Sequence, residues 1–396
     1  MHTLPTELLL EIFQWATDCY YPHPCSYSYY SPFQALEDRA NPNLKIKRSL
    51  SMVCRQWRHL TAQFLYKDVW IGHGAEGLKQ ALKTARSDGG TYADCVERAI
   101  LPFSSTATDP SNTLTNRASI DIIEACSHLR ILVRSQHPTT GGVRFDFEAQ
   151  TVSFPSLERL EWWHHNEAER SGGVNSLSTV LSSAPNLTYL FIGGLAGRQI
   201  ARIGVHSVSL PKLTTLRLRV IDGYILHRIV NSWSLPALSH MVIDAPGWSP
   251  VRLPLLWQAF GSQLRTVEFG KHVRFLLDDT VSLCVQNCPA LEALNFFLFF
   301  TTCPKFVEPH SCLRRVGLHA ADNSIQTDSG TAWTSLDTHF DVLLGDYLPF
   351  LRHIVLHGDW SDAVSDPRFE SILQHAQTVG RCIIYPNESS VSHYSN

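Results

Sequence analysis

A six-residue pattern, L-x-x-L-x-L, recurs along most of this 396-residue chain. The copy at Leu213 matches all three leucines, and the copies at Leu157 and Leu291 have Trp162 and Phe296 in the last position. Looser copies begin at Leu129, Leu187, Leu238, Leu264, Leu313 and Leu351. Most steps between these leucines are 25 to 30 residues long, with one step of 22 and one of 38. A repeat of this length predicts a stack of similar units, because a single unit cannot bury its own apolar side. Such stacks present long recognition surfaces, so the pattern favours binding over catalysis.

Each unit of the repeat combines a short strand with a helical stretch. Within L-x-x-L-x-L the leucines point inward from a parallel strand, and the intervening residues point outward. Helical patterns lie between the strands at 118–126, 175–181, 224–230, 255–260 and 280–285. Because helices take more room than strands along the stack, we expect them on the convex side. The sequence therefore predicts an α/β fold, a leucine-rich-repeat solenoid with parallel strands on its concave face.

The solenoid is expected to span residues 72–385, in about nine to ten irregular units. A degenerate first unit has its helix near 76–86 and its strand at 96–101. The step of 38 residues before Leu351 predicts an inserted loop around 320–333, which is polar and carries Gly and Asp. Residues 386–396 are expected to form a flexible tail.

Composition limits the compartment and the class of partner. The chain is 44% hydrophobic and 17% charged with a formal net charge of −3, which gives no electrostatic reason to expect nucleic acid or an anionic membrane. The longest apolar run, residues 294–300, is far shorter than the roughly 20 residues that cross a bilayer. No signal peptide is expected, because the N-terminus lacks a basic n-region. None of the ten cysteines forms C-x-x-C, so we expect reduced thiols in the cytoplasm or nucleus.

The first seventy or so residues follow a different pattern from the repeat. Residues 1–18 predict an amphipathic helix, with Pro5 in its first turn and with Leu8 and Ile12 on a broad apolar face. Residues 19–46 are dense in Tyr, Ser and Pro, which predicts an exposed, partly mobile loop. A second helix is expected to resume at Ser49 and to continue to Leu60.

Together these segments resemble an F-box. Residues 4–8 read L-P-x-E-L, residues 53–60 read V-C-R-x-W-R-x-L, and residues 65–70 read L-Y-x-x-V-W. The resemblance covers residues 1–71, with the insertion at about 19–46 as a departure from the compact family pattern. F-box proteins of mushroom-forming fungi often carry such an insertion. The pairing of an F-box with leucine-rich repeats is itself a known family arrangement.

The resemblance implies a three-helix module that docks on the Skp-family adaptor of a cullin-RING (SCF-type) ubiquitin ligase. The adaptor-binding residues that it implies are Leu4, Pro5, Leu8, Ile12, Val53, Cys54, Trp57 and Leu60. The residues themselves agree in kind, because a module of about fifty ordered residues has a thin core and leaves apolar surface for a partner to cover. The alternative is that this face packs on the repeats, as in an interaction scaffold without ligase association.

The outward positions of the strands form the candidate surface for an unknown target protein, since arginine and aromatic side chains are common anchors at interfaces. We expect an exposed aromatic patch of Trp163, Tyr189 and Phe191, beside Arg217 and Arg219 as a clamp for a carboxylate or phosphate. Inserted loops that cover the patch, or a register shift that turns Trp163 inward, are the alternatives. The candidate target-binding set is Arg159, Trp163, Tyr189, Phe191, Arg217, Arg219 and Phe297, and further outward positions include Glu268, Asn295, His319 and His357.

No motif for catalysis or for a cofactor is visible in the sequence. G-x-S-x-G, a phosphate-binding loop with lysine and H-E-x-x-H are all missing. The adjacent His164 and His165 would face opposite sides of a strand, so we do not expect them to share a metal ion. We therefore expect a non-enzymatic protein with no cofactor and no metal. An enzyme with an unrecognised site, the remaining alternative, would need a deep pocket with converging polar groups.

Overall fold

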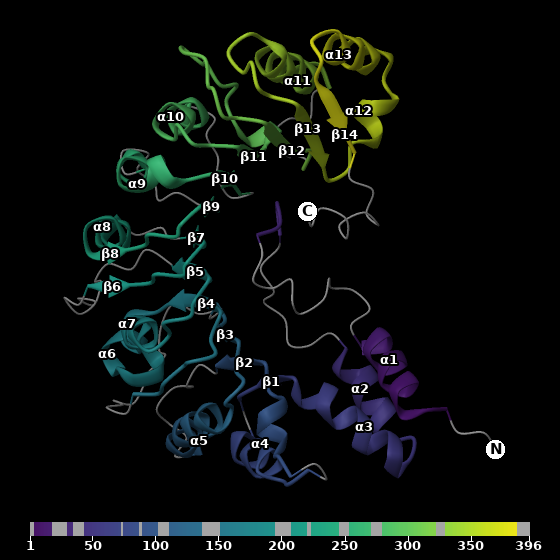
Figure 1. Ribbon diagram of the computed structural model, residues 1–396, viewed down its shortest axis with the longest axis vertical. Helices are drawn as coiled ribbons and strands as arrows, with labels where there is room; N and C mark the ends of the chain where they lie inside the picture. The colour runs from purple at the N-terminus through teal and green to yellow at the C-terminus, as the bar shows by residue number, and fades with distance from the viewer. Residues whose placement is uncertain are drawn as a thin grey trace.

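The computed structural model describes residues 4–17, 30–34, 43–72, 74–86, 89–101, 111–136, 151–194, 207–219, 223–244, 253–270, 279–321 and 329–385. Over these residues the chain forms three N-terminal helices, followed by a curved row of strands with helices along its outer side (Figure 1). The predicted tail at 386–396 lies outside the described residues.

The three N-terminal helices are α1 (Thr6–Thr17), α2 (Leu44–Ser51) and α3 (Arg55–Tyr66), and each contacts the other two. The prediction of one helix from Ser49 to Leu60 is wrong, because the chain leaves the helix after Ser51. Cys54 is extended, with φ of −158° and ψ of 173°, and its Sγ accepts a hydrogen bond of 3.4 Å from the Trp57 N–H. This side chain caps α3, so the break separates two helices that the apolar spacing alone had joined.

Twelve parallel strands form one sheet within the described residues, and their order along the sheet follows their order along the chain. The strands of this sheet are β1 (Asp68–Trp70), β2 (Arg98–Leu101), β3 (Ile131–Arg134), β4 (Arg159–His164), β5 (Tyr189–Gly194), β7 (Thr215–Arg219), β9 (His240–Ile243), β10 (Thr266–Phe269), β11 (Ala293–Phe297), β12 (Arg315–His319), β13 (His353–His357) and β14 (Cys382–Ile384). Residues 68–70, which the sequence pattern placed at the end of the helical module, form the edge strand. A second, two-stranded parallel sheet pairs β6 (Val208–Ser209) with β8 (Trp233–Ser234).

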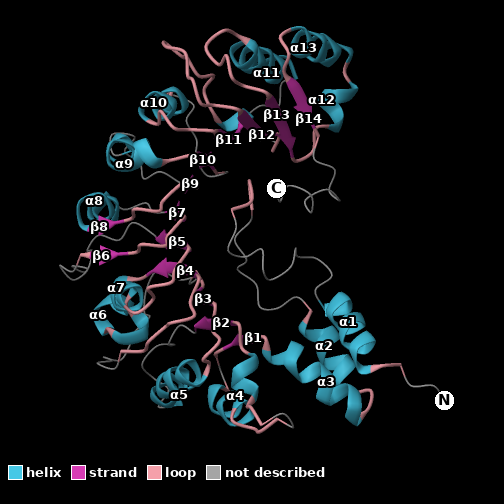
Figure 2. Cartoon of the chain, viewed as in Figure 1, coloured by secondary structure: helices cyan, strands magenta, loops and turns pink. Residues whose placement is uncertain are grey.

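The helices of the repeats lie on the convex side of the sheet, as expected (Figure 2). They are α4 (Ala75–Leu82), α5 (Ser111–Ala125), α6 (Asn166–Ser171), α7 (Leu177–Ser182), α8 (Gly223–Ser232), α9 (Leu253–Phe260), α10 (Thr280–Asn287), α11 (Ser329–Leu344), α12 (Ser361–Ser365) and α13 (Pro367–Thr378), with short 3-10 turns η2 (Tyr92–Cys95), η3 (Gly173–Asn175), η5 (Gly261–Gln263) and η6 (Leu298–Phe300). All five helical stretches predicted between strands are present. Helix α11 begins inside the predicted insertion at 320–333, of which residues 322–328 lie outside the described part.

The repeating leucines build the main core, between the sheet and the convex helices. In the unit around β4, Leu157, Leu160 and Trp162 all belong to this core and are almost fully buried. Burying each such side chain contributes about 1.5–3 kcal/mol, so the repeated pattern is the main apolar driving force of the fold. Trp163, the next residue, lies in a separate cluster with Tyr189 and Phe191. The strand register was therefore predicted correctly, because Trp163 does not turn toward the core.

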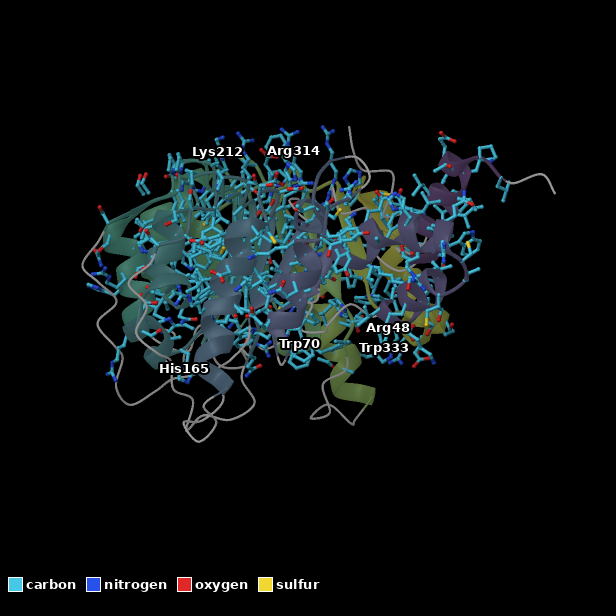
Figure 3. All side chains as sticks on the ribbon, turned by 90° about the horizontal axis from the view of Figure 1, so that it is seen from below. Arg48, Trp70, His165, Lys212, Arg314 and Trp333 are labelled. Carbon is cyan, nitrogen blue, oxygen red and sulfur yellow. The ribbon has the colours of Figure 1, made fainter. Side chains whose placement is uncertain are left out.

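Every strand begins at one rim of the curved sheet and ends at the other. Figure 3 shows Lys212 and Arg314, which precede β7 and β12, along one rim, and His165, which follows β4, at the opposite rim. The arrangement is compatible with a solenoid of strand–helix units. Across the inner face, paired positions form a row, named here the central row: Glu161, Phe191, Arg217, Val242, Glu268, Asn295, Gly317 and Val355. In the part of the chain that the structure describes, no helix has both the length and the apolarity to cross a membrane.

Candidate functional site

Helix α1 buries one side and exposes large apolar side chains on the other. Phe13 is fully buried and meets the Trp57 ring edge-on, with ring centroids 4.8 Å apart. Leu8 and Ile12, one helical turn apart, are 45% and 49% exposed, and Leu4 before the helix is 51% exposed. Four-residue spacing places these side chains above one another on one face. The result is an apolar strip that the described parts of the chain leave largely uncovered.

The turn between α2 and α3 adds to this exposed apolar surface. Val53 is 60% exposed and Met52 is 69% exposed, because the chain leaves the helix there. Of the other predicted adaptor-binding residues, Pro5 and Cys54 are exposed, while Trp57 and Leu60 are half-buried. The name "N-terminal apolar face" is used below for Leu4, Leu8, Ile12 and Val53. Sequence reasoning missed Met52 and Trp15, although Trp15 follows Ile12 at helical spacing and is also exposed.

On the concave face, the predicted aromatic patch is present but buried rather than exposed. Trp163 and Tyr189 are 6% and 3% exposed, and Phe191 is fully buried. The Arg219 guanidinium lies over the Trp163 ring at 5.4 Å, and the Arg159 guanidinium lies over the Tyr189 ring at 3.8 Å. These cation–π contacts cover the aromatic faces that the sequence predicted to be open.

The predicted arginine clamp already holds groups of its own chain. Arg217 pairs with the buried Asp244 at 2.8 Å, and its other terminal nitrogen donates a hydrogen bond of 2.6 Å to the backbone carbonyl of Gln34. Asp244 follows β9, the strand next to β7, so the ion pair joins neighbouring strands. Arg219 contacts Trp163 instead, and the two arginines therefore do not converge on one anion.

Residues 30–34, named here the docked segment, come from the predicted insertion and contact the concave face. Figure 1 shows this short purple stretch inside the curve of the sheet. The Tyr30 hydroxyl donates a hydrogen bond of 2.6 Å to Glu268 Oε2 and accepts one of 2.6 Å from Asn295 Nδ2. The Phe33 N–H donates to the same Glu268 oxygen at 2.8 Å. The segment is therefore not the freely exposed loop that its composition predicted.

The Phe33 ring enters an aromatic pocket on three adjacent strands. Its centroid lies 5.0 Å from those of Phe297 on β11 and His319 on β12, and 4.9 Å from that of His357 on β13. The Tyr30 ring stacks on His240 of β9 at 5.3 Å. Of the predicted target-binding residues, Arg217 and Phe297 thus contact the docked segment. Glu268, Asn295, His319 and His357 were recognised only as outward positions.

The backbone of the docked segment is strained at Phe33. Within the described residues, Phe33 is the only non-glycine residue with a positive φ, of 57°. The Gln34 N–H donates a long hydrogen bond of 3.4 Å to the Ser31 carbonyl, with Pro32 and Phe33 between them, as in a type II turn. That turn usually has glycine where Phe33 stands, and a side chain there costs about 1–2 kcal/mol. The contacts of the Phe33 ring and N–H offset this cost.

Burial changes the acid–base behaviour of the groups around the docked segment. Burial raises the pKa of Glu268 to about 7, although the hydrogen bonds from Tyr30 and Phe33 oppose the shift. Burial, and then the charge of Glu268, raises the pKa of Tyr30 well above its usual value. Burial, with the nearby His319 and Arg315, lowers the pKa of His357 to about 4. Because burial is the largest cause of each shift, the site disfavours the charged forms of these three side chains.

The groups around the docked segment bind polypeptide through main-chain hydrogen bonds, a phenol contact and aromatic rings. Among the described residues no group of three or more His, Cys, Asp or Glu side chains is placed to hold a metal ion. His164, the last residue of β4, and His165 are both half-buried, and Figure 3 shows His165 at the strand-end rim. No protein-family model matches the chain, and no curated protein matches its sequence.

Proposed function

We propose that this protein is the substrate-receptor subunit of a cullin-RING ubiquitin ligase. The observation that carries the proposal is the N-terminal apolar face, in which Leu4, Leu8, Ile12 and Val53 are each about half exposed or more. The motif resemblance of residues 1–71 to an F-box names the partner, a Skp-family adaptor. The curved sheet, in turn, holds a target protein.

The physical argument is the cost of exposed apolar surface. Soluble chains rarely keep several large apolar side chains together in water unless another molecule covers them. Burying one such side chain contributes about 1.5–3 kcal/mol, so four anchors supply enough to offset the loss of translational and rotational freedom on docking. The Phe13–Trp57 contact packs the buried side of helix α1 against α3, so the exposed side chains of α1 have a fixed position.

The mechanism in this proposal is proximity. The N-terminal helices fix the chain to the ligase, and the repeats fix the target, so the target's lysines are held at high effective concentration near the ubiquitin carrier. No residue of this chain takes part in the chemical step. An interaction scaffold without a ligase is the alternative function, in which the N-terminal apolar face has no adaptor to bind.

Co-expression with a Skp-family adaptor tests the proposal. The double variant Leu8→Glu/Ile12→Glu places two charges on the strip while keeping good helix formers in exposed positions. We expect the wild type to co-purify with the adaptor in a one-to-one complex and the double variant to lose it. Phe350→Glu is the matched control, since Phe350 is 52% exposed but lies in the turn before β13.

Circular dichroism of each variant shows whether the fold is kept. Undiminished adaptor binding by a folded Leu8→Glu/Ile12→Glu variant would contradict the proposal. The failure of the wild-type chain to bind the adaptor at all would favour the scaffold. Loss of adaptor binding in the Phe350→Glu control would indicate that the adaptor contacts the turn before β13 and not only the N-terminal helices.

A further inference from the structure

The polar groups of the concave face bind main chain as well as side chain. Glu268 accepts from the Phe33 backbone N–H, and Arg217 donates to the Gln34 backbone carbonyl. Any polypeptide turn offers one such donor and one such acceptor, whatever its side chains. The remaining polar contacts, from Glu268 and Asn295 to the Tyr30 hydroxyl, select a phenol.

The aromatic pocket adds a second side-chain preference, three positions after the tyrosine. Phe297, His319 and His357 surround Phe33 from three strands, and all three rings contact it through edges or tilted faces. Such geometry is favourable between aromatic rings. The pocket therefore fits an aromatic side chain.

Two glycines make room for these contacts, Gly317 in β12 and Gly358 directly after β13. A Cβ at Gly317, in the central row, would lie 2.2 Å from Asn295 Oδ1, the amide that holds Tyr30. A Cβ at Gly358, which has a φ of +79°, would lie 2.6 Å from the His319 ring. The positions of Asn295 and His319 thus depend on residues that carry no side chain.

We propose that the concave face is a recognition site for a turn of the type Tyr-x-Pro-aromatic in a partner polypeptide, and that the docked segment occupies this site within the chain. The inference rests on the proposed function, because the target protein would supply the competing turn. It adds the class of ligand, namely an aromatic-flanked turn bound through main chain and phenol. It also implies that target binding is regulated, because a target must displace residues 30–34 to bind.

The intramolecular occupant has the advantage of being tethered. A segment that belongs to the same chain as its site competes at an effective concentration on the order of millimolar. The strained Phe33 backbone works in the other direction, because it weakens the binding of the docked segment to the site. A target that adds contacts of its own outside the turn can therefore replace the docked segment.

Peptide binding to the full-length chain tests this proposal. The probe is a fluorescein-labelled peptide with the sequence of residues 28–36, SYYSPFQAL. The receptor variant is Tyr30→Ala/Phe33→Ala, which removes the two side chains that hold the docked segment in the site. We expect this variant to bind the peptide about tenfold or more tightly than the wild type does, because its site is open.

Two matched controls locate the binding. In the Tyr30→Ala/Phe33→Ala chain, adding Asn295→Ala is expected to weaken peptide binding about tenfold, since the amide contacts the tyrosine hydroxyl. Adding Asn231→Ala, on the exposed side of α8, should leave the affinity unchanged. A peptide with Phe33→Ala should bind weakly to every form of the chain.

Several outcomes overturn the inference. If the wild type and the Tyr30→Ala/Phe33→Ala variant bind the peptide with equal affinity, the peptide binds at another site. If the folded variant does not bind the peptide, the docked segment has only a structural role. If the double variant does not fold, Tyr30→Phe replaces it: its peptide affinity should exceed that of the wild type, and equality contradicts the proposal. A wild-type dimer that the double variant disperses would show exchange of the segment between copies instead. The assay contains no adaptor, so its failure and that of the proposed ligase role are distinguishable.

Discussion

Glu268 on β10 accepts a hydrogen bond of 2.8 Å from the backbone N–H of Phe33, a residue 235 positions earlier in the chain. The contact brings the docked segment, which lies between α1 and α2 in the sequence, against strands in the middle of the sheet. The same carboxylate oxygen accepts from the Tyr30 hydroxyl. One buried side chain thus organises both ends of the docked segment.

The buried position of Glu268 predicts a pH-dependent stability. Its pKa in the fold is about 7, above the ordinary value of 4.5, so the contribution of Glu268 is fully present below about pH 4.5 and is lost as the pH rises through 7. A shift of this size corresponds to about 3 kcal/mol. Glu268→Gln has no such titration. From pH 4.5 to pH 7 we expect this variant to gain stability relative to the wild type, by up to about 3 kcal/mol.

The measurement is urea unfolding of both proteins across this pH range. The comparison must be a difference, because His357 acts in the opposite direction: its lowered pKa gives stability that is present above about 6.5 and is lost as the pH falls toward 4. This contribution is common to both proteins and cancels. A difference in unfolding free energy that stays constant with pH would refute the prediction.

Phe33 is expected to set the pKa of His357. Burial is the largest cause of the lowered pKa of this histidine, and the Phe33 ring is one of the groups that cover it. Phe33→Ala opens that side of the imidazole to water, so the pKa of His357 should rise from about 4 toward 6.5. Titration of the imidazole resonances by NMR measures the change. In the Phe350→Ala control, at an exposed position, the pKa of His357 should stay at its wild-type value. If the pKa of His357 stays low in Phe33→Ala, the sheet alone buries the imidazole and the prediction is wrong.

The repeats were predictable because their signal is redundant. Leu157, Leu160 and Trp162 face the core for the same reason as their counterparts in every other unit, so a local irregularity does not change the interpretation. Alternation along each strand also placed Glu268 and Asn295 on the other face. The helix break before Cys54 was missed, since Val53 and Trp57 fit one apolar helical face whether or not the helix is continuous.

The docked segment could not be predicted in the same way. Residues 19–46 carry many Tyr, Ser and Pro residues, and this composition indicates only a region without regular structure. The hydrogen-bond partners of Tyr30 lie on β10 and β11, more than 230 positions away, and no short-range pattern connects them. The burial of Trp163 and Tyr189 was missed for a related reason, because arginines from other strands cover them: Arg219 of β7 lies over Trp163 of β4, and Arg159 of β4 lies over Tyr189 of β5.

Cys54 is expected to act on adaptor binding through the start of α3. Its sulfur accepts from the Trp57 N–H, so Cys54→Ala removes the cap and should destabilise the three N-terminal helices by about 0.5–2 kcal/mol. Cys54→Ser keeps an acceptor in the same place and should match or exceed the wild type. Hydrogen exchange of the α3 amides measures the effect. Equal loss of adaptor binding in both variants, with normal exchange protection, would mean that the sulfur contacts the adaptor directly.

Gly317→Ala should release the docked segment without touching it. The new Cβ would lie 2.2 Å from Asn295 Oδ1, so the amide must move and lose its hydrogen bond to Tyr30. That bond contributes about 1 kcal/mol, so protease cleavage within residues 30–34 should become about five times faster. Gly77→Ala in α4 is the control, because its Cβ meets no atom within 4 Å and alanine favours the helix. Equal cleavage rates in the two variants would show that Asn295 does not hold the segment, and Glu268 would then remain as its main polar anchor.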